Sequence, residues 1–485
     1  MRTIVWFRGK DLRLRDHAPL NEAMKGGEVV PLFVLDPYFF APERARRFPH
    51  RIQFLLESLE SLQKNIEHKG SRLVVVSGKS TDVVPKLAAR WRADRVVAHR
   101  WTEPFGRERD RRVQGALSIP FELFEGETLL APGSLRTQNG APYSVFTPFS
   151  RAFFAKSDDI GESLAAPSRL PSLPLDVEAN SVAIPTLREL GIDENPRLVR
   201  GGEAAARERL QTFFSSAAAS YHEGRERMDW PGTSRLSQDL KFGVLSPRVV
   251  WNEARRHAQR HPRARESLAT FQNELVWREF AFSTLWDRPE VLREPFRAGF
   301  VDFPWRFEPA EWEAWASGTT GYPVVDAAAR QLLGEGFVHN RARMIAASFL
   351  TKHLLIHYQR GEAHYLRYLT DGDWAPNNLG WQWSAGSGCD AQPYFRVFNP
   401  VSQGEKFDPD GAYVRRWIPE LANLPARWIH RPWEASTNDL VQAGVALGKN
   451  YPRPIVDHAE ARARYLAIAG EHLQRGSRPD ASAPD

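Results

Sequence analysis

The chain has a single cysteine, Cys389, among its 485 residues. One thiol can form neither an internal disulfide nor a cysteine-rich metal site, so a disulfide-stapled secreted framework is excluded. The histidines show no HExxH or paired metal-ligand spacing, so we expect no catalytic metal. No apolar run approaches the length of a membrane span, and the apolar start turns charged too early for a signal peptide. These absences predict a cytoplasmic protein with no membrane contact.

Two common enzyme signatures are also missing. No nucleophile elbow occurs. The first apolar run is followed by Phe7-Arg8-Gly9-Lys10-Asp11 instead of a glycine fingerprint, so ordinary dinucleotide binding is not expected there. Residues 386–391, GSGCDA, match a loose dinucleotide pattern, but they follow no strand and open no β-α unit.

What the chain does contain is an ordinary balance of 42% apolar and 26% charged residues, over a length that suggests two or three domains. The formal charge of +6 favours anionic partners, although it is weak when spread over 485 residues.

The first 130 residues alternate short apolar runs with longer amphipathic segments. Residues 51–68 carry apolar side chains at nearly i, i+3, i+4, i+7 spacing, which predicts a helix. Buried strands that alternate with helices predict a doubly wound parallel sheet of five strands. The five expected strands are residues 3–7, 29–35, 72–76, 95–99 and 121–124.

The residue pattern changes twice in the rest of the chain. Prolines recur through residues 131–202, which predicts an interdomain connector with a short helix near residues 149–156. Residues 203–473 read as successive helices and hold 13 of the 16 tryptophans. We therefore predict an α/β domain at residues 1–130, an all-α domain at 203–473, and a flexible tail at 474–485.

Residues 371–400 are the most unusual stretch. They read DGDWAPNNLGWQWSAGSGCDAQPYFRVFNP and place three tryptophans among aspartates and asparagines. Each indole ring is large and its N–H needs a partner, so such density favours a site that stacks a flat aromatic ligand. A buried aromatic hinge explains the composition equally well.

Other motifs of the helical half allow two interpretations. Residues 230–237, WPGTSRLS, run from a turn into hydroxyls at a helix start, which suits either a diphosphate cradle or a plain N-cap. Glu274 and Trp277 lie one turn apart on a predicted helix. Asn340, Arg343 and Met344 share another helical face. A solvated face is the alternative for both sets.

Together these stretches resemble the photolyase/cryptochrome family, and within it the bacterial photolyases of cyclobutane pyrimidine dimers. The resemblance runs in family order across nearly the whole chain. It is carried by TIVWFR…DLRLRD, SVFTPF, DWPGTSRLSQDLKFGVLSPR, NELVWREF, TGYPVVDAAARQL, HNRARMIAASFLTKHLL, DGDWAPNNLGWQW and PYFRVFNP…QGEKFD. It implies an α/β antenna domain, a connector and a helical domain that binds FAD.

The resemblance also implies the flavin-binding residues. Asn377 resembles the residue that faces flavin N5, and Arg343 would compensate the charge of the reduced anion FADH⁻. The implied FAD-binding set is Tyr221, Thr233, Ser234, Arg235, Leu236, Ser237, Arg343, Asp371, Asp373 and Asn377.

The implied reaction is light-driven repair of damaged DNA, in which one electron passes from excited FADH⁻ to a flipped-out dimer and then returns. The implied catalytic residues are Glu274, Trp277, Asn340, Met344, Asn377 and Trp383. The implied DNA contacts are Arg225, Lys241, Trp277, Arg341 and Trp383. We expect the enzyme to be a monomer.

Several positions depart from the family pattern. The loop FRGKDLR has one residue more than the usual F-R-x-D-L-R, at the place where an antenna chromophore would lie. Phe105 and Gly106 replace the Asn-Glu of folate-binding relatives, so an 8-hydroxy-deazaflavin antenna is favoured over methenyltetrahydrofolate, and an empty site stays open. Phe337 replaces a more usual tryptophan near the flavin.

The photoreduction chain departs as well. The family reduces oxidised FAD through three tryptophans, and Tyr358 occupies the middle place between Trp381 and Trp305. A tyrosine is hard to oxidise unless its proton leaves with the electron, and the neighbouring His357 is a doubtful acceptor. We therefore predict a detour through Trp374.

Two other functions within the family fit these residues less well. A (6-4) photolyase usually needs a histidine pair near the lesion, whereas this chain has His339 followed by Asn340. A cryptochrome photoreceptor usually carries a long C-terminal extension and altered lesion-site residues, whereas this chain has a short tail and keeps Glu274, Trp277 and Met344. Dimer repair is therefore the favoured function.

Overall fold

The computed structural model describes residues 1–177 and 181–475. Residues 476–485, most of the predicted tail, lie outside this range. The chain divides into two compact units, each of which is described by itself. The first comprises Met1–His222, Thr233–Pro289 and Thr370–Ala375, and the second comprises Glu223–Gly232, Glu290–Leu369 and Pro376–Asp485. The domain boundaries expected at residues 130 and 202 stay predictions.

A five-stranded sheet forms the centre of the first unit. The strand order is β3-β2-β1-β4-β5 and every pairing is parallel, which confirms the predicted fold class. The strands are β1 (Arg2–Phe7), β2 (Glu28–Leu35), β3 (Val74–Ser77), β4 (Arg95–His99) and β5 (Phe121–Phe124). β1, β2 and β4 are almost continuously buried because helices cover both faces of a doubly wound sheet.

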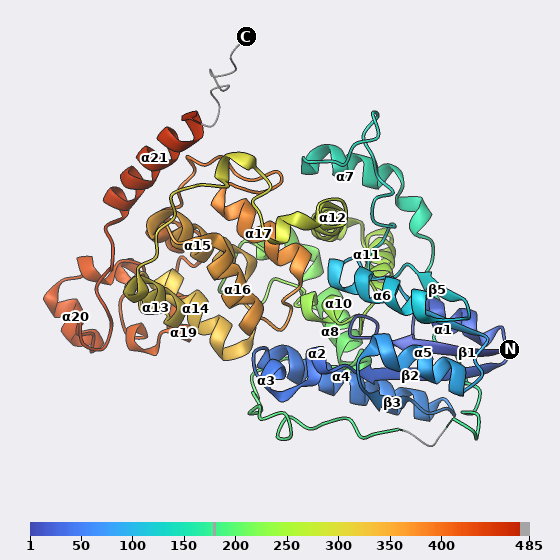
Figure 1. Cartoon of the computed structure of the whole chain (residues 1–485). Coiled ribbons are helices and arrows are strands. Elements are labelled where there is room, and N and C mark those ends of the chain that lie inside the picture. Colours follow the sequence, from blue (N-terminus) through green and yellow to red (C-terminus); the bar gives the residue numbers. More distant parts are fainter. Residues whose placement is uncertain (178–180, 476–485) are drawn as a thin grey trace, which may run out of the picture. The chain divides into compact units, whose positions relative to one another are not determined.

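Right-handed crossovers place α1 (Ala18–Met24) and α4 (Pro49–His68) on one face of this sheet. They place α5 (Ser80–Arg90) and α6 (Pro104–Ala116) on the other face, where the two helices are in contact (Figure 1). The strand order reverses between β1 and β4. The carboxyl ends of these two strands are therefore the topological switch point, beside which open α/β sheets bind ligands.

The remaining helices of the first unit continue into the predicted helical half. The predicted helix near residues 149–156 is present as α7 (Phe146–Ala155), which begins three residues earlier. These helices are α2 (Pro37–Phe40), α3 (Pro42–Ala45), α7 (Phe146–Ala155), α8 (Glu203–Ser216), α10 (Ser237–Lys241), α11 (Pro247–Arg260) and α12 (Arg265–Asp287). Two further helices, α9 (Tyr221–Gly224) and α17 (Trp374–Ala385), run from one unit into the other.

The second unit is helical around one large aromatic and aliphatic core. Directly after α15 (Asn340–Ser348) the chain makes one π-helical turn, Phe349–His353, and such turns are frequent at functional sites. No helix of the described residues is both long and apolar enough to cross a membrane. The helices of the second unit are α13 (Pro309–Ser317), α14 (Pro323–Glu335), α15 (Asn340–Ser348), α16 (Tyr358–Tyr368), α18 (Pro400–Phe407), α19 (Ala412–Trp417), α20 (Thr437–Ala443) and α21 (His458–Arg475).

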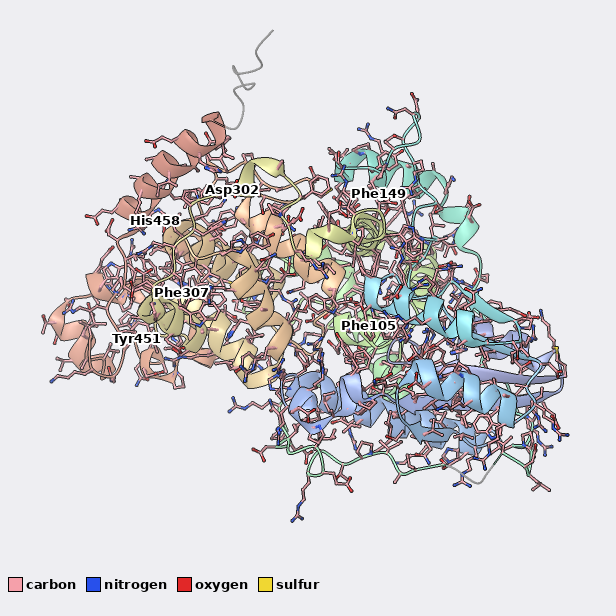
Figure 2. All side chains as sticks on the ribbon, viewed as in Figure 1. Phe105, Phe149, Asp302, Phe307, Tyr451 and His458 are labelled. Carbon is pink, nitrogen blue, oxygen red and sulfur yellow. The ribbon has the colours of Figure 1, made fainter. Side chains whose placement is uncertain are left out.

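One buried carboxylate holds the turn that precedes α14. Asp326 accepts the backbone N–H of Thr320 at 2.7 Å and that of Gly321 at 3.1 Å. The hydroxyl of Tyr451, labelled in Figure 2, donates to it at 2.7 Å, so Asp326 ties this turn to a distant segment. Burial raises the pKa of Asp326 to about 6, because the hydrogen bonds only partly offset the loss of solvation.

Asp326→Asn should destabilise the protein. Whichever way the new amide lies, its NH₂ group faces the backbone N–H of Thr320 or Gly321, and two donors cannot bond each other. We expect the free energy of unfolding to fall by about 1–3 kcal/mol, measured by denaturant unfolding. Asp302→Asn makes the same change at an exposed residue and should cost less than about 0.5 kcal/mol. Equal unfolding midpoints for the two variants would contradict this role of Asp326.

Candidate functional site

The predicted site residues divide between the two units. The first unit holds Tyr221, Thr233 to Ser237, Lys241, Glu274, Trp277, Asp371, Asp373 and Trp374. The second holds Arg225, Trp305, Asn340, Arg341, Arg343, Met344, Tyr358, Asn377, Trp381 and Trp383.

The predicted phosphate loop leads directly into α10. Arg235, in its middle, has a φ of 53°, a left-handed conformation that costs a non-glycine residue on the order of 1 kcal/mol. The side chain of Gln238 donates to the carbonyl of Arg235 at 2.5 Å and holds this conformation. Residues kept in such strained conformations cluster at ligand clamps. The loop therefore fits a phosphate-binding role, although α10 is too short for its dipole to contribute much.

Trp277 is backed by a second aromatic ring. Its indole is half-buried on α12 and stacks on Phe146 of α7, with ring centroids 3.6 Å apart and planes 6° apart. Phe146 thus covers one face of the indole and fixes its plane. Glu274 lies one turn earlier on the same helix and is also half-buried. Sequence reasoning missed Phe146, although it stands in the SVFTPF motif that supports the family resemblance.

The amide of Asn377 is oriented by α16. Its Nδ2 donates to the carbonyl of Glu362 at 3.2 Å, which leaves Oδ1 as the acceptor end of the side chain. The neighbouring Asn378 donates to the carboxylate of Glu362 at 3.1 Å and to the carbonyl of Val291 at 3.0 Å. Burial raises the pKa of Glu362 to about 7. An acceptor fixed in this way suits the N5–H of a reduced flavin.

Two predicted residues of the lesion pocket share one face of α15. The amide nitrogen of Asn340 lies 3.8 Å from the thioether sulfur of Met344. Arg341, predicted to contact DNA, places a guanidinium nitrogen 3.8 Å from the same sulfur and forms a close ion pair with Glu226. Arg225 also approaches Glu226, at 3.7 Å. Glu226 is therefore an anionic partner of both arginines.

The switch point of the sheet is filled by a buried charge cluster. The ammonium of Lys10 bonds to Glu103 at 2.9 Å and to Asp373 at 3.3 Å, and it forms a closer ion pair with Glu127. Burial disfavours the charged ammonium, but these three carboxylates outweigh burial and raise the pKa of Lys10. Sequence reasoning missed this cluster, because its four residues are far apart along the chain.

Lys241 belongs to the same cluster. Its side chain is 11% exposed, its ammonium lies 3.9 Å from Glu103, and burial lowers its pKa. An ammonium held in this way already has an internal counter-charge. The predicted contact between Lys241 and DNA stays a prediction. Asp373, predicted to bind FAD, is likewise bonded to Lys10, and the charges of Lys10 and Lys241 lower its pKa despite its burial.

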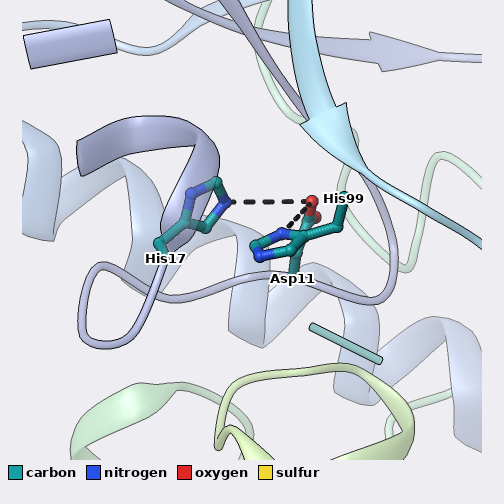
Figure 3. A group of neighbouring side chains, drawn as sticks. All are labelled: Asp11, His17 and His99. Carbon is teal, nitrogen blue, oxygen red and sulfur yellow. Dashed lines mark hydrogen bonds and ion pairs between the residues drawn. The ribbon is translucent and has the colours of Figure 1, made fainter. Parts of the chain in front are cut away.

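A second buried cluster joins Asp11, His17 and His99 at the same edge of the sheet (Figure 3). Its nitrogens and oxygens lie at metal-ligand spacing, but Nδ1 of His17 accepts the backbone N–H of Leu20 at 3.0 Å. A neutral imidazole has one lone-pair nitrogen, so Nε2 of His17 carries a proton and points it at Asp11, 3.8 Å away. Nδ1 of His99 lies 3.3 Å from the same carboxylate. The two imidazoles, His17 and His99, therefore stabilise the buried carboxylate of Asp11.

The comparisons with known proteins cover nearly the whole chain. The profile of the DNA photolyase family matches residues 3–170, and that of the FAD binding domain of DNA photolyase matches residues 271–471. The chain is 41% identical to the deoxyribodipyrimidine photo-lyase of Agrobacterium fabrum, over 96% of each protein. The chain belongs to the DNA photolyase family.

Solved structures agree. A bacterial class III photolyase from Agrobacterium tumefaciens superposes with a TM-score of 0.90 at 39% identity, covering 98% of both chains. A cryptochrome from Synechocystis superposes with a TM-score of 0.87 at 33% identity, covering 96% of this chain and 99% of that one. Photolyase and cryptochrome thus share this fold, so the fold alone does not separate repair from signalling.

Replacing Lys10 tests the buried cluster. Lys10→Met keeps the side-chain length but leaves Glu103, Glu127 and Asp373 without their main counter-charge, which should cost about 3–5 kcal/mol of unfolding free energy near pH 7.5. The loss should shrink toward pH 5. Without Lys10 the folded-state pKa values of these acids rise, so their protonation at low pH relieves the folded variant.

Denaturant unfolding at the two pH values measures this effect. Lys64→Met removes an exposed lysine and should change stability little at either pH. A loss for Lys10→Met that stays constant between pH 7.5 and 5 would show that the lysine contributes packing and not charge.

Proposed function

We propose that this protein is a light-driven photolyase that repairs cyclobutane pyrimidine dimers in DNA. The chain is similar over almost its full length to enzymes named deoxyribodipyrimidine photo-lyase. The observation that carries the proposal is Trp277: one face of its indole is already stacked on Phe146, one turn from Glu274 on α12. A ring held flat in this way is prepared to stack a flipped-out base on its other face.

FAD is the proposed cofactor, held by Tyr221, the loop from Thr233 to Ser237, Arg343, Asp371, Asp373 and Asn377. Two features of these residues fit a flavin: the strained Arg235 in the loop, and the fixed acceptor of Asn377. When bound and reduced, FAD would supply one excited electron to the dimer and take it back after the cyclobutane ring opens. The protein's own part is to bind, orient and exclude water.

The lesion would be received by Glu274, Trp277, Asn340, Met344 and Trp383. The two indoles would clasp the dinucleotide, and Glu274 would bond to the edge of a thymine. Arg225 and Arg341 would contact phosphates after exchanging Glu226 for DNA, which makes binding dependent on salt. We also propose that the enzyme acts as a monomer in the cytoplasm.

An antenna chromophore of the 8-hydroxy-deazaflavin type stays a prediction, favoured over methenyltetrahydrofolate. The switch point of the sheet does not fit it. Lys10 lies among three carboxylates there, and the guanidinium of Arg109 lies 4.3 Å from the ring of Trp101. These side chains bond to one another at that place, so we assign no step to an antenna.

The test of the function is repair itself. Purified protein with pre-reduced flavin is mixed with a duplex whose restriction site contains a cyclobutane dimer, and the mixture is exposed to blue light. A photolyase restores cleavage at that site in the light and not in the dark. A protein that binds FAD and absorbs blue light but never restores cleavage would instead be a photoreceptor, which is the cryptochrome alternative.

Trp277→Ala should weaken binding to dimer-containing DNA by about 1–3 kcal/mol, the contribution of one base–aromatic stack. Filter binding measures this against undamaged DNA of the same sequence. Trp277→Phe keeps a flat ring against Phe146 and should lose less. Flavin content should stay near that of the wild type in both variants. Unchanged discrimination between damaged and undamaged DNA in Trp277→Ala would remove Trp277 from the pocket.

Glu274→Ala should lower the repair yield per absorbed photon several-fold while FAD stays bound, because Glu274 orients the dimer through a hydrogen bond. Glu274→Gln keeps a hydrogen-bonding side chain and should retain more of the yield. The measurement is repair per photon at saturating damaged DNA. If Glu274→Ala matched the wild type there, Glu274 would contribute to binding alone.

A further inference from the structure

Tyr358 is poorly suited to pass an electron. Its side chain is 1% exposed, and burial, together with the charge of Glu362, raises the pKa of its phenol. Within the described residues its hydroxyl has no hydrogen-bond partner of good geometry, and the one side chain that bears on it, the amide of Gln359, is not a base. A phenol is easily oxidised only when a base takes its proton at the same time, and no such base is bonded to this one. Tyr358 would therefore hold up an electron chain that ran through it.

The neighbouring His357 cannot take the proton either. The two rings are stacked, with centroids 4.7 Å apart and planes 27° apart, so the imidazole presents its face to the tyrosine. Nδ1 of His357 accepts the backbone N–H of Gln359 at 3.1 Å as the N-cap of α16. Its lone pair is thus already used, and Nε2 carries the proton. The ring of Trp305 makes an edge contact with that of His357, with centroids 5.4 Å apart, so a path from Tyr358 to Trp305 would pass this histidine.

Trp381 has a different tryptophan neighbour. Its ring meets that of Trp315 with centroids 6.0 Å apart in an edge arrangement. Trp315 in turn stacks on Trp312, with centroids 5.5 Å apart and planes 30° apart. In the described part of the chain no ring contact joins Trp381 to Tyr358. The continuous line of indoles from Trp381 therefore passes through Trp315 to Trp312.

The fold fixes each ring of this line. Gly361 lets the ring of Trp381 lie directly on α16, because a Cβ there would come within 2.2 Å of it. Trp315 is 2% exposed and its indole N–H donates to the carbonyl of Ala346 at 3.1 Å. Trp312 is one turn earlier on α13 and is partly exposed, so the line ends at solvent.

The surroundings also suit oxidised indoles. The ring of His364 lies 5.5 Å from that of Trp315 and 5.6 Å from that of Trp312. Burial lowers the pKa of His364 to about 4, so this imidazole is neutral at pH 7. A neutral ring beside both indoles adds no positive charge that would oppose the loss of an electron from them.

We propose that Trp381, Trp315 and Trp312 form the electron chain that reduces the bound flavin in light. This inference rests on the proposed function for the presence of FAD. Trp381 would give one electron to the bound, photoexcited flavin in its oxidised state. The vacancy passes to Trp315 and then to Trp312, where an external thiol supplies the replacement electron. Two such events turn two thiols into a disulfide, so the electrons balance.

This route replaces the predicted detour through Trp374. Trp374 and Trp381 do lie on one helix, α17, as that prediction required. Trp374 is 39% exposed and belongs to the first unit, whereas the ring contacts of Trp381 are with Trp315 and Tyr365 of the second. Tyr358 and Trp305 lie off the chain and contribute packing.

The experiment compares five variants that each remove one ring's redox function and keep a ring: Trp315→Phe, Trp312→Phe, Tyr358→Phe, Trp305→Phe and Trp374→Phe. FAD-loaded protein is illuminated with an external thiol, and flavin reduction is followed by absorbance. Trp315→Phe and Trp312→Phe should slow reduction by about an order of magnitude or more, and the other three should stay within about twofold of the wild type. FAD content and unfolding midpoint control for folding.

A second readout locates the electron vacancy. Pulsed EPR after a light flash should find an indole radical at the greatest separation from the flavin in the wild type, and at a shorter separation in Trp312→Phe. Repair by pre-reduced protein should be unchanged in all five variants, since it needs no chain. If photoreduction were intact and repair failed, the proposed repair function would be wrong and the proposed electron chain would be unaffected.

Several outcomes would overturn the chain itself. They are strong loss of photoreduction in Tyr358→Phe, Trp305→Phe or Trp374→Phe, wild-type rates in Trp315→Phe, a tyrosyl radical after the flash, or no photoreduction in the wild type.

Discussion

The first unit depends on a balance of charge that is sealed from water. Lys10 forms ion pairs with Glu103, Glu127 and Asp373, and these four residues come from separate parts of the chain. Burying any one of these ions alone would cost several kcal/mol, and their mutual attraction is what makes the burial tolerable. Arg51 completes the arrangement by donating to the carbonyl of Gly372 at 3.2 Å. The loops that end β1 and β4 are therefore held to the segment at residues 370–375.

The same ion pairs occupy the switch point of the sheet. Open α/β sheets leave a crevice where the strand order reverses, and nucleotide-binding proteins fill it with a ligand. Here a lysine and its carboxylates fill it, close to two imidazoles that solvate Asp11. The unit has kept the topology of a ligand-binding sheet and used the place for internal ion pairs.

The sequence predicted those parts of the fold whose signal lies within a short stretch of neighbouring residues. The five strands appear as short buried runs, and α4 as an apolar stripe, because burial on a sheet or helix face leaves a period in the sequence. The predicted third strand begins two residues before β3, because the apolar Leu73 extends the run ahead of the first paired residue, Val74. The flavin loop and the lesion residues were named through family resemblance. The contacts of Lys10, Phe146 and Trp315 join residues that no local period relates.

Tyr358 shows where residue-by-residue transfer of roles stops. A resemblance places Tyr358 at the middle of an electron chain, yet an electron responds to ring type, distance and the availability of a proton acceptor. The same core that buries Tyr358 brings Trp315 against Trp381 and sets Trp312 behind it. The proposed repair would start from flavin that is already reduced, so it would not depend on which residues carry the electrons that reduce the flavin. The electron chain can therefore lose the indole at position 358, because the core places Trp315 beside the same first donor, Trp381.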